Sequence, residues 1–289
     1  MKKRRNLSQF PVRTVRTRQS SKEEAMRKLL DLPPEVMLMI FMKLGAFDIL
    51  YSIPLVCSTW RKITQDPQAF SVIDLRDTMS YFWKHDHNLY TKFVKNLVDK
   101  SCGELMKIYI SDLGTNELLQ YIVSNTNKLV SLRIVHCDIY DDGLLEAFTK
   151  KFPLLEELEL RGCFDCTKQV IEAVGRSCPQ LKYFRYNFDD FCPPIKDEEF
   201  ACALAKNMPQ LRRLQLYGNT VLTNNDLKVI LKSCVHLDYL DLRRCRSINI
   251  NEVSLKKSLS RIKTVKLPHD FTAGWFDMDS EMEDAASEV

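Results

Sequence analysis

The sequence predicts an α+β repeat fold, in which a short helical module precedes a solenoid with parallel strands inside and helices outside. Two observations predict it. Residues 32–70 form an apolar stretch that prolines and a glycine divide into helix-sized pieces. Over residues 70–267, large apolar residues recur with a spacing of 24 to 30 residues. Such a spacing is typical of solenoids, whose units bury their apolar sides against each other.

The apolar stretch is expected to form three short helices. Pro33 suits a first helical turn, where backbone N–H groups have no partner within the helix. Gly45 is expected to end that first helix. A second helix is expected over residues 48–52. Because a proline is not tolerated inside a helix, Pro54 is expected to begin the third, which ends before Asp66-Pro67.

This module carries more apolar surface than three short helices can bury. Val36, Ile40 and Leu44 would line one face of the first helix, while Phe41 and several methionines cover most of the rest. A segment of about 40 residues is too small to bury all of these side chains by itself. The remaining apolar patch must therefore contact the rest of the chain or a partner.

The spacing of residues in this module resembles the F-box family. The matching residues are Leu32-Pro33, Glu35, Ile40-Phe41, Leu44, Val56-Cys57-x-x-Trp60-Arg61 and Asp66-Pro67. The resemblance implies docking onto the Skp adaptor and, through it, onto the cullin and RING subunits of SCF ubiquitin ligases. A buried helical cap on the following domain is the alternative, but it leaves the second apolar face unexplained. The residues assigned to Skp binding are Leu32, Pro33, Glu35, Val36, Ile40, Phe41, Leu44, Leu50, Val56, Cys57 and Trp60.

The second part of the chain repeats the pattern L-x-x-L-x-L. Successive central residues are 24, 26, 26, 30, 26 and 25 positions apart, which is the period expected of leucine-rich repeats. These central residues are Ile108, Leu132, Leu158, Phe184, Leu214, Leu240 and Val265. The Cys or Asn that often ends such a strand is found as Cys137, Cys163, Asn219 and Cys245, whereas Leu113 and Asp189 depart from the pattern.

Helices are expected between the strands. Their ranges are 90–100, 116–123, 141–150, 167–176, 197–206, 225–232 and 251–259. Asp141, Asp197 and Asn225 are the expected N-caps. The long step after Leu181 contains Phe188, Phe191 and Pro193-Pro194, which would form either a binding loop or an adjustment of repeat packing.

Module and repeats together resemble plant F-box/leucine-rich-repeat proteins of the Skp-interacting type, over residues 30–267. By that resemblance, the array is the receptor for a protein substrate that is to be ubiquitinated and degraded. The expected divisions are a basic arm over residues 1–28, the F-box over 29–70, the repeats over 71–268 and an acidic tail over 269–289. The arm and the tail are expected to be disordered because they combine charge with few apolar residues.

Composition narrows the function further. The formal charge is only +4, and no apolar run is long enough to span a bilayer. With ten cysteines and no secretory signal, an intracellular protein with reduced thiols is expected, in the nucleus, the cytoplasm or both. The cluster Lys2-Lys3-Arg4-Arg5 would be a nuclear-import signal, a nucleic-acid arm or simply a solvated tail.

Motifs for catalysis or cofactor binding are not found in the sequence. It has no Gly-rich phosphate loop, His-Glu-x-x-His helix or Gly-x-Ser-x-Gly elbow. Cys163-x-x-Cys166 has the spacing of metal ligands, but no second pair follows, and His85-Asp-His87 lacks a third ligand nearby. The sequence therefore predicts a non-catalytic adaptor that holds no cofactor and no metal.

The functional surface of the array is expected on the strand residues that alternate with the core leucines, since these point away from the core. Tyr and Arg, which are enriched at binding hot spots, gather in the last units. The candidate substrate-binding residues are Arg133, Glu159, Tyr183, Arg185, Arg213, Tyr217, Tyr239 and Arg243. Two other functions compete. One is a scaffold outside a ubiquitin ligase that binds protein or, less readily, nucleic acid. The other is a thiol-dependent enzyme using Cys163 or Cys166.

Overall fold

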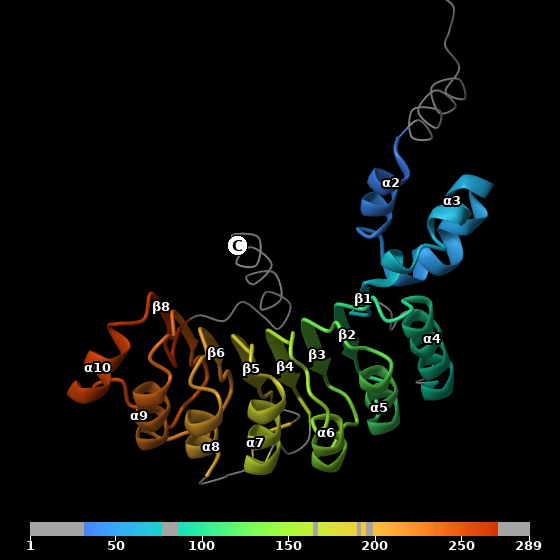
Figure 1. Ribbon diagram of the computed structural model, residues 1–289. Coiled ribbons are helices and arrows are strands. Elements are labelled where there is room, and N and C mark those ends of the chain that lie inside the picture. Colours follow the sequence, from blue (N-terminus) through green and yellow to red (C-terminus); the bar gives the residue numbers. More distant parts are fainter. Residues whose placement is uncertain (1–31, 77–85, 164–166, 190–191, 195–198, 271–289) are drawn as a thin grey trace, which may run out of the picture.

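The computed structural model describes residues 32–76, 86–163, 167–189, 192–194 and 199–270. In these ranges a helical module lies at one end of a curved array, with the strands of the array on one side and its helices on the other (Figure 1). The expected basic arm, nearly all of the acidic tail, Cys166, His85, Phe191 and Asp197 lie outside the described residues.

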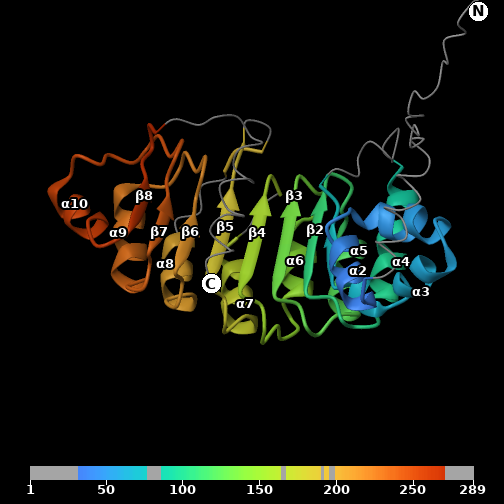
Figure 2. The same cartoon turned by 90° about the horizontal axis from the view of Figure 1, so that it is seen from above.

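The strands of the described residues form one eight-stranded parallel sheet in chain order, as Figure 2 shows. The register aligns the repeats: Ile108 pairs with Leu132, and Leu132 pairs with Leu158. The same row continues to Val265, which confirms the predicted repeat. The strands are β1 (Val72–Asp74), β2 (Lys107–Ser111), β3 (Ser131–Val135), β4 (Glu157–Arg161), β5 (Tyr183–Asn187), β6 (Arg213–Gln215), β7 (Tyr239–Asp241) and β8 (Thr264–Lys266).

A helix follows each strand from β1 to β7, and the apolar stripe of each packs on the sheet. The helices are α4 (His87–Lys100), α5 (Asn116–Ser124), α6 (Asp141–Ala147), α7 (Lys168–Ser177), α8 (Phe200–Asn207), α9 (Asn224–Ser233) and α10 (Val253–Leu259). The side of the sheet opposite to these helices is called the strand face below. All the expected helices of the array exist, with ends that differ by up to three residues.

Two expected N-caps are wrong. Tyr140, not Asp141, precedes α6, and the Asp141 carboxylate instead accepts hydrogen bonds from the backbone N–H (3.1 Å) and hydroxyl (2.6 Å) of Thr167 in the next unit. Thr223, not Asn225, caps α9, in a capping box with Asp226. Asp141 does not cap α6 because its side chain binds Thr167 of the neighbouring unit instead.

The helical module consists of α2 (Pro34–Phe41), the π-helical turn η1 (Asp48–Ser52), the 3₁₀ turn η2 (Ile53–Leu55), α3 (Ser58–Ile63) and the 3₁₀ turn η3 (Pro67–Phe70). Two expected boundaries are wrong. The first helix already ends at Phe41 and does not extend to Gly45. Pro54 belongs to η2 rather than to the third helix. The third helix, α3, begins only at Ser58 because the backbone of Cys57 is extended, with φ −162° and ψ 169°.

Module and array share one apolar core. Buried side chains of α2 and η1 belong to the same cluster as the leucines of the repeats. At the junction, Phe47 and Tyr51 each lie 6.1 Å from Phe93 of α4, measured between ring centroids. The module is therefore packed on the first helix of the array. Within the described residues, none of the helices combines the length and the apolar character that a membrane span requires.

Candidate functional site

Helix α2 has two apolar faces, and only one of them is buried. Met37 and Phe41 are 2% and 1% exposed and face the core of the module. Val36 and Ile40 are 40% and 39% exposed, and Leu44, in the turn after the helix, is 44% exposed. Residues four apart lie on the same side of a helix, so these three side chains form an exposed apolar stripe.

The residues Val56-Cys57-x-x-Trp60 build the second half of the module. Cys57 caps α3: its Sγ accepts a hydrogen bond from the backbone N–H of Trp60 at 3.5 Å. The indole of Trp60 then packs edge-on against Phe41, with ring centroids 5.0 Å apart. Arg61 closes the turn by donating from Nε to the carbonyl oxygen of Pro54 at 3.1 Å. The spacing Cys-x-x-Trp is thus a capping geometry that brings an aromatic ring onto α2.

Three exposed apolar residues of the module were missed by the sequence analysis as binding candidates. Leu55 is 78% exposed, Met39 68% and Tyr51 47%. Leu55 follows Pro54 in η2, whereas the sequence pattern placed these two residues at the start of the third helix. The signal that could have found Leu55 is its position directly after Pro54, which interrupts the helical pattern.

The structure divides the predicted Skp-binding residues into three groups. Phe41 is buried, which corrects its assignment to the docking surface: the ring holds α2 on Trp60 instead. Four residues are half-buried, namely Leu32, Leu50, Cys57 and Trp60. Six residues are exposed, namely Pro33, Glu35, Val36, Ile40, Leu44 and Val56.

Comparison with known proteins settles the family. The F-box-like family model matches residues 29–76. F-box protein SKIP19 of Arabidopsis thaliana is 37% identical over 241 residues, covering 83% of this chain and 77% of the relative. The chain belongs to the F-box/leucine-rich-repeat family. F-box/LRR-repeat protein 23 of the same plant is also 37% identical, over 257 residues, and this chain spans 55% of its length.

Solved structures similar to this F-box/leucine-rich-repeat protein are more distant. An internalin from Listeria monocytogenes is 21% identical, with a TM-score of 0.40 and coverage of 63% of this chain and 51% of the other. The yeast Rad7 and Elc1 complex gives 16% identity and a TM-score of 0.40, covering 84% of this chain and 68% of the other.

In this F-box/leucine-rich-repeat protein, the middle of the strand face consists of acidic and basic side chains that pair with one another. Glu157 accepts hydrogen bonds from Arg133 at 3.0 Å, from the hydroxyl of Ser131 at 2.8 Å, and from Arg185. Glu159 lies 3.5 Å from Arg185. Burial would raise the pKa of Glu157, but Arg185 and Arg133 hold it at about 2. Acids and bases of three neighbouring units therefore neutralise one another.

Burial on the strand face corrects the expectation that all eight candidate substrate-binding residues are presented to a ligand. Arg133, Tyr183, Arg213 and Tyr239 are half-buried. Glu159, Arg185, Tyr217 and Arg243 are at most 6% exposed. The physical reason is pairing: Arg133 and Arg185 pair with Glu159, Arg243 pairs with Asp241, and two arginines stack on tyrosine rings. Arg213 lies 5.2 Å from the ring centroid of Tyr183, and Arg243 lies 5.7 Å from that of Tyr217.

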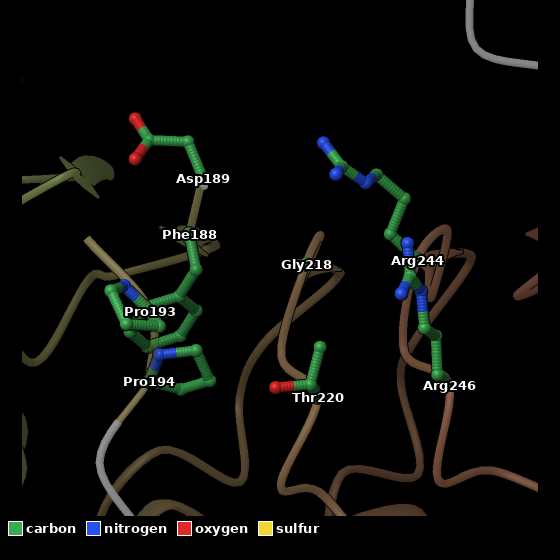
Figure 3. Close-up of a pocket in the computed structure, with 8 residues that line it drawn as sticks. All are labelled: Phe188, Asp189, Pro193, Pro194, Gly218, Thr220, Arg244 and Arg246. Atoms are coloured by element: carbon green, nitrogen blue, oxygen red, sulfur yellow. The ribbon is translucent and has the colours of Figure 1, made fainter. Parts of the chain in front are cut away.

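A cavity of about 180 Å³ opens where β5, β6 and β7 end. Phe188, Pro193 and Pro194 form one wall, and Arg244 and Arg246 stand on the opposite side (Figure 3). Asp189, Gly218 and Thr220 complete the lining. Phe188, which the sequence analysis placed in a binding loop or a packing adjustment, thus takes part in a cavity, although its own side chain is 4% exposed.

The buried cysteines are structural groups. The Sγ atoms of Cys163 and Cys245 donate to carbonyl oxygens of the preceding strand or turn, those of Ile134 at 3.7 Å and Leu216 at 3.0 Å. Burial raises the pKa of both thiols to about 12, so they stay protonated and are poor nucleophiles at neutral pH. Among the described residues, no three His, Cys, Asp or Glu side chains are grouped as metal ligands.

Proposed function

We propose that this protein is the substrate-recognition subunit of an SCF-type cullin–RING ubiquitin ligase. Its F-box binds the Skp adaptor, and its repeat array binds a protein substrate. The observation that carries the proposal is the exposed apolar stripe of Val36 and Ile40 on α2 and of Leu44 in the turn after it, because the opposite face of α2 is packed in the core of the module. Exposed apolar surface of this extent is typical of protein–protein interfaces.

The energetics favour a partner at this stripe. Burying a half-exposed aliphatic side chain is worth about 1 kcal/mol, and the stripe together with Met39, Leu55 and Val56 offers six such groups. Their sum is comparable with the lower estimates of the cost of bringing two proteins together. The Arabidopsis relative named SKIP19 supports an Skp-type partner for this chain as well.

Catalysis belongs to the partner enzymes in this proposal. Holding a substrate on the array and the adaptor on the F-box raises the effective concentration of the substrate near the ligase. The packing of Phe47 and Tyr51 against Phe93 supports such a role, because a fixed junction limits the volume that the substrate explores.

Co-purification of the full chain with Skp tests the proposal. The variant Ile40→Ala with Leu55→Ala removes exposed side chains only, so it is expected to fold like the wild type. We expect it to retain at least tenfold less Skp. The matched control, Leu154→Ala with Val235→Ala, removes two exposed apolar groups of the array (48% and 54% exposed) and is expected to retain Skp fully. Equal retention of Skp by the wild type and the Ile40/Leu55 variant would refute the proposal.

A further inference from the structure

The charge of the strand face differs between its two halves. Over β3 to β5, two carboxylates lie among three arginines. The pairs are Arg133–Glu157 at 3.0 Å, Arg133–Glu159 at 3.9 Å, Arg161–Glu159 at 3.6 Å and Arg185–Glu159 at 3.5 Å. This half is held together by its own charges. A charged ligand would have to break these buried pairs in order to bind there, which is costly.

The other half, around the ends of β6 to β8, is basic. It carries Arg213, Arg244, Arg246 and Lys266. Among the described residues of this half, Arg213 lies over the ring of Tyr183 and Arg244 over the ring of Tyr217, and three carboxylates have partners within the chain. Asp241 forms a buried pair with Arg243 at 2.8 Å, and Asp189 lies 2.7 Å from His136. Asp270 accepts a hydrogen bond from the backbone N–H of Leu267 at 2.6 Å. Anions are therefore attracted to this end of the array.

The cavity described above lies at this basic end. Arg244 and Arg246 project from the turn after β7, and across the cavity stand Phe188, Pro193 and Pro194 (Figure 3). A guanidinium group donates two parallel hydrogen bonds to a carboxylate or a phosphate, and it binds such groups more specifically than an ammonium does. The apolar wall suits the aliphatic part of an acidic side chain. The volume of about 180 Å³ suits one such side chain.

The backbone at Arg244 fixes the position from which its side chain reaches the cavity. Arg244 has a φ of +63°, the left-handed conformation that favours glycine. The corresponding residue one unit earlier is Gly218, with a φ of +73°. An arginine at such a position costs about 1 kcal/mol or more relative to a glycine. The same conformation is found at Asp112 and His136 in earlier units, so it belongs to the repeat turn, and Arg244 differs from them in the guanidinium group that it brings to the cavity.

We propose that the cavity binds an acidic peptide segment, with Arg244 and Arg246 as the anion-binding residues. The proposal rests on the function proposed above, since it names the chemistry of the substrate that the array receives. An acidic segment has two possible sources. One is a protein substrate, and the other is this chain itself, whose residues 271–289 contain six Asp or Glu and no Lys or Arg.

Fluorescence anisotropy with a labelled octaglutamate peptide tests the site on the full chain. The variant Arg244→Gln with Arg246→Gln is expected to weaken binding at least tenfold. The matched control, Lys232→Gln with Lys256→Gln, removes the same charge from exposed positions on α9 and α10 and is expected to weaken it less than twofold. Loss of binding to the same extent in both variants, or no binding by any chain, would overturn the proposal.

A third variant identifies the source of the acidic segment. It removes all six acidic side chains of the terminal segment by Asp277→Asn, Asp279→Asn, Glu281→Gln, Glu283→Gln, Asp284→Asn and Glu288→Gln. Tighter binding of octaglutamate by this variant would show that the chain's own segment competes for the cavity, whereas unchanged binding would assign the cavity to an external substrate. No binding even by this variant would overturn the site. Skp retention by the Arg244/Arg246 variant is measured in parallel, so failure of the cavity and failure of the F-box are separate results.

Discussion

Single residues in the left-handed conformation follow the strands β2, β3, β4, β6 and β7. They are Asp112, His136, Gly162, Gly218 and Arg244, with φ between 51° and 73°. At Gly218 the turn is also crowded, because a Cβ there would lie 2.4 Å from the carbonyl oxygen of Phe188. In these turns the backbone conformation favours glycine, and a turn that holds another residue there has an energetic cost.

Replacing Arg244 by glycine separates this cost from the use of the side chain. Relief of strain stabilises the variant, while the greater freedom of the unfolded chain partly offsets the gain. We expect the free energy of unfolding in urea to stay unchanged or to rise by up to about 1 kcal/mol, while octaglutamate binding falls. Arg212→Gly is the control, since Arg212 is exposed and is not among the residues with positive φ; it is expected to lose about 0.5–1 kcal/mol. A large loss of stability in Arg244→Gly with binding retained would contradict this account.

At the scale of the element, α2 combines a structural face and a free face. Phe41 packs on Trp60 and is 1% exposed, whereas Ile40, its neighbour in sequence, is 39% exposed. Truncation of a buried aromatic side chain leaves a cavity, and truncation of an exposed side chain does not. The two faces should therefore respond oppositely in tests of stability and of binding.

Phe41→Ala is expected to lower the free energy of unfolding by about 3–5 kcal/mol, and Ile40→Ala by less than about 1 kcal/mol. Urea unfolding of the full chain, followed by circular dichroism, measures both. Skp retention under native conditions is expected to fall in Ile40→Ala although the chain stays folded. A stability loss in Ile40→Ala as large as that in Phe41→Ala would show that the exposed face is part of the core.

The period of the repeats is readable from the sequence because it depends on apolar burial, which one-dimensional spacing records. The central residues from Ile108 to Val265 form one row of the sheet, as their spacing predicts. Element ends are less readable, since they depend on competition between local and distant partners. Asp141 illustrates this: it has the chemistry of an N-cap, but it binds Thr167 from the next unit.

At the scale of the whole molecule, the strand face was predictable as a surface but not as a network. Alternation in the strands predicts that Arg133 and Glu159 point away from the core. Spacing does not predict that Glu157 lies between Arg133 and Arg185, because these residues are 24 and 28 positions away and meet only when the units stack. The exposed apolar surface of the F-box was predictable as an excess, whereas the buried position of Phe41 depends on its contact with Trp60.

The charge network links the stability of the whole array to pH. The pKa of Glu157 is about 2 in the folded chain, below the ordinary value of 4.5, because Arg185 and Arg133 outweigh the effect of burial. A carboxylate with a depressed pKa stabilises the fold fully above its unfolded pKa, and this contribution is lost as the pH falls toward the folded pKa. The wild type is therefore expected to lose stability between about pH 4.5 and pH 2.

Glu157→Gln tests this linkage in the middle of the array. The variant is expected to be less stable than the wild type at pH 7, since Arg133 and Arg185 each lose one of their two carboxylate partners and keep only Glu159. It is also expected to show a smaller loss of melting temperature between pH 4.5 and pH 2. Glu146→Gln removes an exposed carboxylate from α6 and is expected to keep the acid transition of the wild type. Because β3, β4 and β5 meet at Glu157, the network couples neighbouring units. An acid transition in Glu157→Gln as steep as in the wild type would show that the network does not carry this coupling.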